Sequence, residues 1–210
     1  MTTSAPTAIV GLGYVGLPLA QAAVRAGIPI VGFDINQRVV TELQAGRSPI
    51  SDIDDAGIQA MLANGFAPTT DAAKLDACDT FIICVPTPLS ADQGPDLAAV
   101  TSAAQTLVPH LSKGDLVVLE STTYPGTTEE IVGPILATSG LAVPSDIKLA
   151  FSPERVDPGN PTYGITNTPK VVGGMTPACV ERATAVYSEV CNEVVAVSSP
   201  EAAELSKLLE

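Results

Sequence analysis

The stretch Ala8-Ile9-Val10-Gly11-Leu12-Gly13-Tyr14-Val15-Gly16 decides the fold, because it predicts a short buried strand, a glycine turn and the first residues of a helix. Gly11 allows a tight turn, and Gly13 removes a side chain where a pyrophosphate must approach the backbone. Gly16 lets the helix pack closely on the strand. The helix N-terminus offers free N–H groups and the positive end of its dipole, so this turn is suited to binding phosphate.

The residues after this turn place a carboxylate beside it. Residues 17–26 are rich in alanine and leucine and predict a helix, with Gly27 as its C-cap. The apolar run 28–33 predicts the next strand and ends at Asp34, about 20 residues beyond the glycines, where an acid accepts the hydroxyls of an adenosine ribose. These features predict a site for NAD, because Asp34 would repel the 2′-phosphate of NADP. The alternative is a glycine-rich turn in another kind of α/β protein, with Asp34 only capping the next helix.

Composition limits the class of protein. The chain has 210 residues, of which 46% are hydrophobic, enough for one large domain with a substantial core. Its formal net charge is −13 and it has no basic cluster, which predicts no binding to nucleic acid or to an anionic membrane. Residues 1–6 lack the features of a signal peptide, and no apolar run reaches the roughly 20 residues that cross a bilayer. The four cysteines (Cys78, Cys84, Cys179, Cys191) lack metal-ligand spacing, so we expect free thiols, no metal site and a cytoplasmic location.

Strand and helix patterns alternate along the rest of the chain. Further strands are predicted at residues 66–70, 80–85, 116–119, 147–151, 170–172 and 194–197. Further helices are predicted at residues 35–45, 56–64, 71–76, 96–111, within 120–138, at 177–191 and from 199 onward. This alternation predicts an α/β fold of the Rossmann type, a doubly wound, mainly parallel sheet with helices on both faces. We expect residues 1–198 to form this domain and residues 199–210 to begin a helix that lacks a C-capping residue, which suggests a truncated chain.

Three predicted strands end in loops rich in proline and hydroxyl groups. The loops contain Pro86-Thr87-Pro88, Glu120-Ser121-Thr122-Thr123-Tyr124-Pro125-Gly126-Thr127 and Ser152-Pro153-Glu154-Arg155. Ligands of an open parallel sheet bind beyond the carboxyl ends of its strands, so we expect these loops to meet beside the glycine turn. The alternative is that their prolines and threonines are ordinary loop residues and helix caps, with Thr127 or Thr128 capping the following helix.

These motifs resemble one protein family in their order. G-L-G-Y-V-G-L-P-L, V-P-T-P, E-S-T-T-Y-P-G-T-T, F-S-P-E-R and E-A-A-E-L-S-K-L-L-E resemble the UDP-glucose/GDP-mannose dehydrogenase family over essentially the whole chain. The chain is similar to the family's N-terminal NAD-binding domain and the start of its central connecting helix. Within the family, S-P-E-R-x-D-P-G-N is most similar to the UDP-N-acetylglucosamine and UDP-N-acetylmannosamine 6-dehydrogenase branch. The resemblance implies an enzyme of polysaccharide biosynthesis that oxidises the C6 alcohol of a UDP-sugar to a uronic acid with two NAD+.

The resemblance also implies roles for individual residues. The residues implied to bind the cofactor are Gly11, Gly13, Tyr14, Val15, Gly16, Asp34, Arg38, Pro86, Thr87, Ser121 and Thr122. Thr122 would also place the water used in proton transfer, Glu154 would assist hydrolysis of a cysteine thioester, and Lys207 would stabilise the oxyanion at C6. Glu154, Arg155 and Lys207 would contact the UDP-sugar, and the full-length protein would be a homodimer.

Without the resemblance, some of these residues could have a purely structural role. Lys207 could be a solvated lysine on a helix face, and Glu154 could be a loop carboxylate that caps a helix. His110, the only histidine, follows Pro109 near a predicted helix end, and we expect it to be a helix-terminal residue rather than a catalyst.

The chain also departs from the family pattern. The basic residue expected five positions after the acid is Val39 here, so Arg38 is the candidate to take its place. The second acid of the glucose branch falls at Pro158, one position after Asp157. The G-G-x-C motif of the nucleophilic cysteine and the asparagine expected after Glu210 are absent, so the chain would hold NAD without completing the reaction. Two other functions stay open: a one-step hydroxyacid-type NAD dehydrogenase and a non-catalytic NAD-binding regulatory module.

Overall fold

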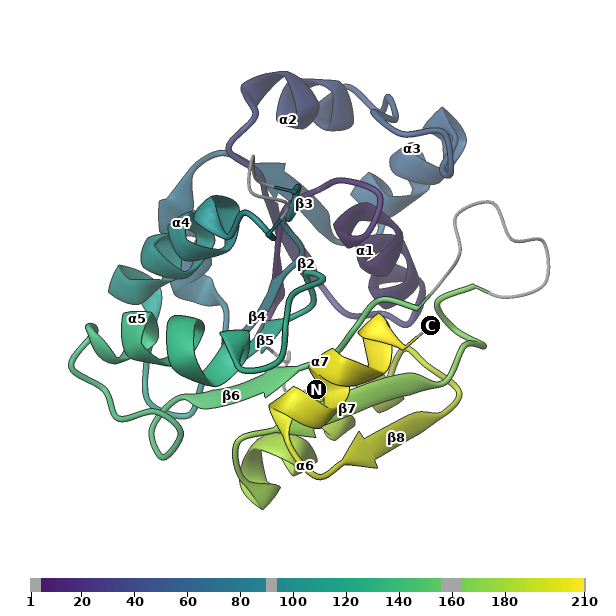
Figure 1. Ribbon diagram of the computed structural model, residues 1–210. Helices are drawn as coiled ribbons and strands as arrows, with labels where there is room; N and C mark the ends of the chain where they lie inside the picture. Colours follow the sequence, from purple (N-terminus) through teal and green to yellow (C-terminus); the bar gives the residue numbers. More distant parts are fainter. Residues whose placement is uncertain (1–4, 90–93, 156–163, 210) are drawn as a thin grey trace.

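The computed structural model describes residues 5–89, 94–155 and 164–209, and within them one sheet runs through the whole molecule (Figure 1). Its strand order is β3-β2-β1-β4-β5-β6-β7-β8. The strands are β1 (Thr7–Val10), β2 (Ile30–Phe33), β3 (Phe66–Thr69), β4 (Thr80–Ile83), β5 (Leu116–Leu119), β6 (Lys148–Phe151), β7 (Lys170–Gly174) and β8 (Val194–Val197). All eight predicted strands are therefore confirmed, with small differences at their ends.

The sheet is parallel except at one junction. Strands β1 to β6 pair in parallel, and so do β7 and β8. Strand β7 runs antiparallel to β6, with Phe151 opposite Gly173 and Ala150 opposite Gly174. Because β7 is reversed, its first residue lies at the same edge of the sheet as the carboxyl ends of β5 and β6. The predicted mainly parallel sheet is confirmed, and the reversal of β7 was not anticipated.

Helices cover both faces of this sheet. The α-helices are α1 (Gly16–Arg25), α2 (Gln37–Gln44), α3 (Asp55–Ala63), α4 (Ala98–Leu107), α5 (Gly133–Ala137), α6 (Pro177–Ser188) and α7 (Pro200–Leu208). Short 3₁₀ turns, η1 (Ala72–Ala77) and η2 (Val108–His110), and a π-helical segment, η3 (Thr127–Val132), complete the chain. In Figure 1, α1 lies on one side of the central strands and α4 and α5 lie on the other. The predicted doubly wound α/β fold is confirmed.

Two hydrophobic cores result from this layering. Ile9 of β1 joins the core that holds α1 and Tyr187 of α6, whereas its neighbours Ala8 and Val10 join the core that holds α4 and α5. Successive residues of a strand point to opposite faces, so one short apolar strand contributes to both cores. This is why residues 8–10 are all apolar rather than alternating.

The end of α1 shows how local sequence sets the entry to β2. Gly27 has a φ of 87°, its N–H donates to the carbonyl of Val24 at 3.0 Å, and the Ile28 N–H donates to the carbonyl of Ala23 at 3.0 Å. This pair of bonds is a Schellman ending, which needs a left-handed residue directly after the helix. The structure places the C-cap at Ala26 and Gly27 one position later, one residue from the prediction.

The passage after β5 differs from the prediction. Gly126, with a φ of 98°, occupies the position before η3, and no side chain caps that segment. The Thr127 hydroxyl donates to the Tyr124 carbonyl at 2.8 Å, and the Thr128 hydroxyl donates to a carboxylate of α7. The expectation that Thr127 or Thr128 caps this helix was wrong, because Gly126 holds the N-cap position of η3 and Val132 that of α5, and neither has a capping side-chain bond. Within the described ranges, none of the helices is both long and apolar enough to span a membrane.

Candidate functional site

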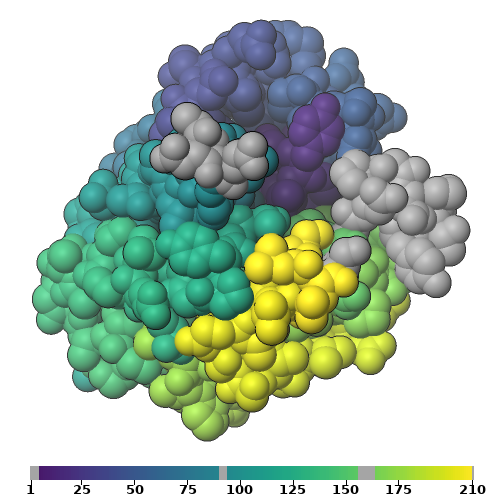
Figure 2. Space-filling view, in the orientation of Figure 1, coloured from purple at the N-terminus to yellow at the C-terminus, as the bar shows by residue number. Residues whose placement is uncertain are grey.

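A cleft of about 590 Å³ opens beyond the carboxyl ends of β1, β2 and β4. Strand β1 pairs with β2 on one side and with β4 on the other, so the cleft lies where the strand order reverses. Its walls are residues 10–15, residues 33–36, Val39, residues 49–50, residues 84–86 and one face of α4. In Figure 2 the purple N-terminal segment, the blue segment with α2 and the teal segment with α4 meet on one face of the molecule.

The glycine turn forms one wall of this cleft. Gly11 has a φ of 95°, and a Cβ there would lie 2.7 Å from the Cys84 carbonyl oxygen. A Cβ on Gly16 would lie 1.9 Å from the Gly11 carbonyl oxygen, so α1 can begin this close to the turn only with glycine. A Cβ on Gly13 would meet no atom within 4 Å, and Gly13 lines the cleft, so a ligand can approach its backbone. The first N–H groups of a helix lack intrahelical partners, so the start of α1 is chemically suited to phosphate oxygens.

Asp34 lies in the cleft and is fastened to the glycine turn. Its Oδ2 accepts the Leu12 N–H at 2.8 Å, and its Oδ1 accepts the Asn36 N–H at 2.8 Å. A carboxylate oxygen can accept a second hydrogen bond, so both oxygens can still receive ribose hydroxyls. The residue that caps α2 is Asn36, whose side chain accepts the Arg38 N–H, and so the alternative of Asp34 as the helix cap was wrong.

Replacing Asp34 by alanine is expected to weaken NAD+ binding by more than about 1.4 kcal/mol, a tenfold rise in Kd, because charge-assisted bonds to the ribose are lost. The measurement is calorimetric titration of NAD+ into both proteins, with Asp52→Ala as the control because Asp52 is exposed and outside the cleft lining. The wild-type protein is expected to bind NADP+ more weakly than NAD+, because its 2′-phosphate would face the Asp34 carboxylate. An unchanged Kd for Asp34→Ala would remove Asp34 from the site.

The predicted cofactor residues divide into two groups. Those that line the cleft are Gly11, Gly13, Tyr14, Val15, Asp34 and Pro86. Those outside its lining are Gly16, Arg38, Thr87, Ser121 and Thr122. Arg38 is exposed on α2, while its neighbour Val39 lines the cleft, so a role for Arg38 stays a prediction.

The hydroxyl side chains outside the lining hold two loops together. The Ser121 hydroxyl donates to the Val85 carbonyl at 2.7 Å, and the Thr87 hydroxyl donates to the Thr122 carbonyl at 2.6 Å. The loop after β4 is therefore tied to the loop after β5 at two points. These bonds bring Thr87, Ser121 and Thr122 together, as expected for loops that follow the carboxyl ends of parallel strands, and leave the Thr122 side chain exposed.

The far wall of the cleft was not among the predicted site residues. Four small residues of α4 line it: Ala99, Ser102, Ala103 and Thr106. Their spacing of three, four and seven positions puts them on one face of a helix, and this pattern of small residues was visible in the sequence. Pro49 and Ile50, which also line the cleft, gave no such signal.

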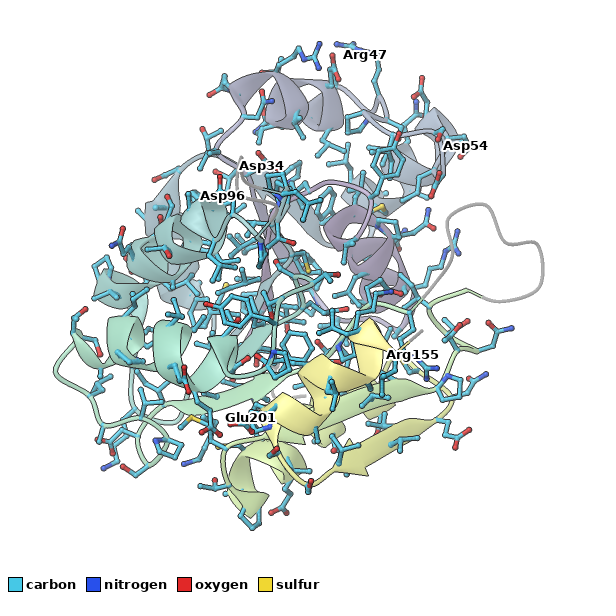
Figure 3. All side chains as sticks on the ribbon, in the orientation of Figure 1. Asp34, Arg47, Asp54, Asp96, Arg155 and Glu201 are labelled. Atoms are coloured by element: carbon cyan, nitrogen blue, oxygen red, sulfur yellow. The ribbon has the colours of Figure 1, made fainter. Side chains whose placement is uncertain are left out.

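The predicted substrate residues lie at another part of the same sheet edge. Glu154 Oε1 accepts the Arg155 N–H at 2.9 Å, and Glu154 Oε2 lies 3.4 Å from Lys170 Nζ. Arg155 Nη1 donates to the Pro169 carbonyl at 3.4 Å. Figure 3 shows Asp34 near α4 and Arg155 beside α7, so the two ends of the candidate site are well separated. Asp157 and Pro158, where the family pattern is broken, lie outside the described residues.

Helix α7, which carries Lys207, is anchored to the loop that follows β5. Glu204 is fully buried and accepts the Gly126 N–H at 2.6 Å, the Thr128 N–H at 2.9 Å and the Thr128 hydroxyl at 2.6 Å. Burial raises the pKa of Glu204, against the opposing effect of these donors. In Figure 2 the yellow helix lies against the green segment that contains η3 and α5. Lys207 is half-buried on the last turn of α7, so it is not a fully solvated surface lysine.

His110 and three of the cysteines lie outside the cleft lining, and Cys84, which lines it, is a buried thiol. His110 ends η2, as predicted, and its Nδ1 lies 2.6 Å from Asp76 Oδ1. All four cysteines are buried free thiols, and burial with nearby aspartates raises the pKa of Cys78 to about 12. Burial likewise raises the pKa of Cys191 to about 11, so these thiols are poor nucleophiles at neutral pH. In the part of the chain that the structure describes, no group of three or more His, Cys, Asp or Glu could hold a metal ion.

Comparison with known proteins adds to this geometry. The family model for the "UDP-glucose/GDP-mannose dehydrogenase family, NAD binding domain" matches residues 5–191. The chain is 38% identical over 205 residues to UDP-N-acetyl-D-glucosamine 6-dehydrogenase of Pseudomonas aeruginosa, covering 97% of this chain and 48% of that protein. It is 37% identical over 210 residues to UDP-N-acetyl-D-mannosamine dehydrogenase of Yersinia pestis, covering 96% of this chain and 50% of that protein.

A solved structure is similar over the same region. The UDP-D-ManNAc dehydrogenase of Pyrococcus horikoshii matches with a TM-score of 0.91 and 32% identity, covering 97% of this chain and 49% of that chain. The chain thus spans about half the length of the relatives that it matches.

Proposed function

Because this chain belongs to the UDP-glucose/GDP-mannose dehydrogenase family and contains its NAD-binding domain, we propose that it is the cofactor-binding part of a UDP-sugar 6-dehydrogenase. The proposed substrate is a UDP-N-acetylhexosamine, whose C6 alcohol is oxidised to a carboxylate with two NAD+. The observation that carries the proposal is the cleft at the reversal of strand order, with Asp34 hydrogen-bonded to the glycine turn. The names of the relatives from Pseudomonas aeruginosa and Yersinia pestis support an N-acetylated sugar.

The residues that line the cleft would hold and orient the cofactor. Bound NAD+ accepts a hydride at its nicotinamide ring. The backbone at Gly13, Tyr14 and Val15 would bind the pyrophosphate, and Asp34 would bind the adenosine ribose. The small side chains of α4 would leave room for a flat ring against the opposite wall.

The loops after β5 and β6 and helix α7 would act on the sugar. Thr122 would place the water that takes part in proton transfer, and the Lys207 ammonium would stabilise negative charge at C6. Glu154 would accept a proton from the water that hydrolyses a thioester, while the sulfur leaves as a thiolate. We place the nucleophilic cysteine outside this chain, because all four cysteines here are buried. The enzyme would work in the cytoplasm as a homodimer, in polysaccharide biosynthesis.

The stoichiometry of NADH tests this function. The full-length enzyme is incubated with NAD+ and either UDP-N-acetylglucosamine or UDP-N-acetylmannosamine, with UDP-glucose as the comparison substrate. We expect two NADH for each N-acetylated sugar and a uronic acid product in the mass spectrum. One NADH per substrate would favour the one-step hydroxyacid type of dehydrogenase. Tight NAD+ binding with no turnover of any nucleotide sugar would favour a regulatory module.

A further inference from the structure

A buried chain of polar groups lies beneath the loops that follow β5 and β6. The Tyr187 hydroxyl of α6 donates to Glu120 Oε2 at 2.8 Å. Lys170 Nζ donates to Glu120 Oε1 and also lies 3.4 Å from Glu154 Oε2. The side chains of Lys170 and Glu120 are 5% and 0% exposed, so this ion pair is almost completely removed from water.

The reversed strand β7 brings the lysine to this place. Glu120 directly follows β5 and Glu154 follows β6 by three residues, so both lie at the carboxyl edge of the sheet. Lys170 is the first residue of β7, and a parallel β7 would have put it at the opposite edge. The antiparallel pairing therefore places one ammonium group between two carboxylates that come from neighbouring strands.

Stability alone is a weak explanation for this network. Removing two charges from water costs several kcal/mol per ion, and well-packed apolar side chains often stabilise a core at least as well as a buried ion pair. Burial lowers the pKa of Lys170, but the carboxylates of Glu120 and Glu154 outweigh burial and hold it above its usual value. The two carboxylates thus favour the protonated form of Lys170, whose Nζ also lies 5.1 Å from the centre of the Tyr187 ring.

The network restrains the side chain of Glu154, the one member that the proposed function uses. Glu154 Oε2 faces Lys170, and Glu154 Oε1 accepts the Arg155 N–H, so donors hold both carboxylate oxygens. Lys170 is held in turn by Glu120, and Glu120 by Tyr187. A lysine that is itself held by a second carboxylate allows Glu154 a smaller range of orientations than a solvated lysine with a flexible side chain would.

We propose that Lys170 is a positioning residue that holds the Glu154 carboxylate for the hydrolysis step, with Glu120 and Tyr187 holding Lys170 from behind. The proposal rests on the hydrolytic role proposed above for Glu154. Loss of Lys170 leaves the first hydride transfer intact, because that step does not use Glu154, and slows release of the uronic acid.

The test is a double-mutant cycle in the full-length enzyme, with Lys170→Met, Glu154→Gln and the double variant. Thioester adduct is followed by mass spectrometry, and the first NADH is followed in a single turnover. We expect Lys170→Met to slow thioester hydrolysis at least about tenfold, so that the adduct accumulates. The rate of formation of the first NADH should change by less than about twofold. In the Glu154→Gln background, Lys170→Met should slow hydrolysis further by less than about twofold, because Lys170 acts through the Glu154 carboxylate, which is already absent.

Two further variants separate positioning from folding. Lys170→Arg keeps the cation and should recover part of the hydrolysis rate. Lys148→Met is the control, because Lys148 is a lysine at the start of β6 whose Nζ donates to the Ser145 carbonyl at 2.6 Å, away from the network. Lys170→Met alone leaves the Glu120 charge buried without its partner, which can prevent folding. The double variant Glu120→Gln with Lys170→Met replaces the ion pair by neutral groups and is used in that case.

Each result decides between the proposals. An equal slowing by Lys170→Met with and without Glu154 would overturn the positioning role and leave the proposed function standing. If neither the Lys170→Met protein nor the double variant with Glu120→Gln folds, as judged by circular dichroism, Lys170 is a folding residue. That result would also overturn the positioning role. Normal hydrolysis by Glu154→Gln would instead show that the proposed role of Glu154 is wrong, and this inference would fail with it.

Discussion

Replacement of Gly16 by alanine is expected to abolish measurable NAD+ binding and to destabilise the protein by roughly 3 kcal/mol. The added Cβ would lie 1.9 Å from the Gly11 carbonyl oxygen and 3.1 Å from Cys84 Cβ. Gly11 is itself restricted by the Cys84 carbonyl, so the turn cannot move away cheaply. Either α1 shifts or the turn opens, and both changes displace the N–H groups that we propose bind the pyrophosphate. The measurements are calorimetric titration with NAD+ and urea denaturation.

Gly13→Ala is the matched comparison for this result. A Cβ at Gly13 would meet no protein atom within 4 Å, and the residue lines the cleft. We expect Gly13→Ala to leave the free energy of unfolding within about 0.5 kcal/mol of wild type and to weaken NAD+ binding. A Gly16→Ala protein that binds NAD+ with wild-type affinity would contradict the described geometry of the turn.

Replacement of Glu204 by alanine is expected to lower the free energy of unfolding by at least about 3 kcal/mol. The change leaves three donors without their acceptor at a fully buried position: the N–H groups of Gly126 and Thr128 and the Thr128 hydroxyl. Each buried donor left unsatisfied costs about 1–3 kcal/mol, although the three costs are not additive. Urea denaturation measures the loss, and amide hydrogen exchange should show faster exchange in α7 and η3 than in β1.

Glu181→Ala is the control for the Glu204 variant. Glu181 is an exposed glutamate on α6, so its removal should change the free energy of unfolding by less than about 0.5 kcal/mol. An effect of Glu204→Ala as small as that of Glu181→Ala would mean that α7 is not anchored through this carboxylate. The anchoring of the helix that carries Lys207 would then lose its structural basis.

The parts of the fold that could be predicted are those set by local sequence. The strand predicted from residue 8, the glycine turn and the end of α1 within one residue of Gly27 each follow from residues within one turn or one strand. The direction of β7 could not be predicted, because an apolar strand has the same pattern in either direction. The far wall of the cleft comes from α4, which is more than 80 residues beyond the glycine turn, and only packing brings the two together.

The buried charges show a second limit of prediction from sequence. A lysine at the start of a strand is expected to be exposed, since lysine is almost never fully buried without a partner. The partners of Lys170 are Glu120 and Glu154, which are 50 and 16 residues away in the sequence. Glu204 lies in the quoted motif E-A-A-E-L-S-K, in which only Lys207 was assigned a role. Its acceptor role depends on Gly126 and Thr128, more than 70 residues earlier.

A crystal structure of this chain with saturating NAD+ tests the central claim most directly. The claim is that the turn at residues 11–16 binds a dinucleotide pyrophosphate and that Asp34 binds the adjoining ribose. We expect the diphosphate within hydrogen-bonding distance of N–H groups between Gly13 and Gly16, both ribose hydroxyls on Asp34 and the adenine between residues 35–39 and α4. A cleft that stays empty at saturating NAD+, or a dinucleotide bound elsewhere on the molecule, would contradict it.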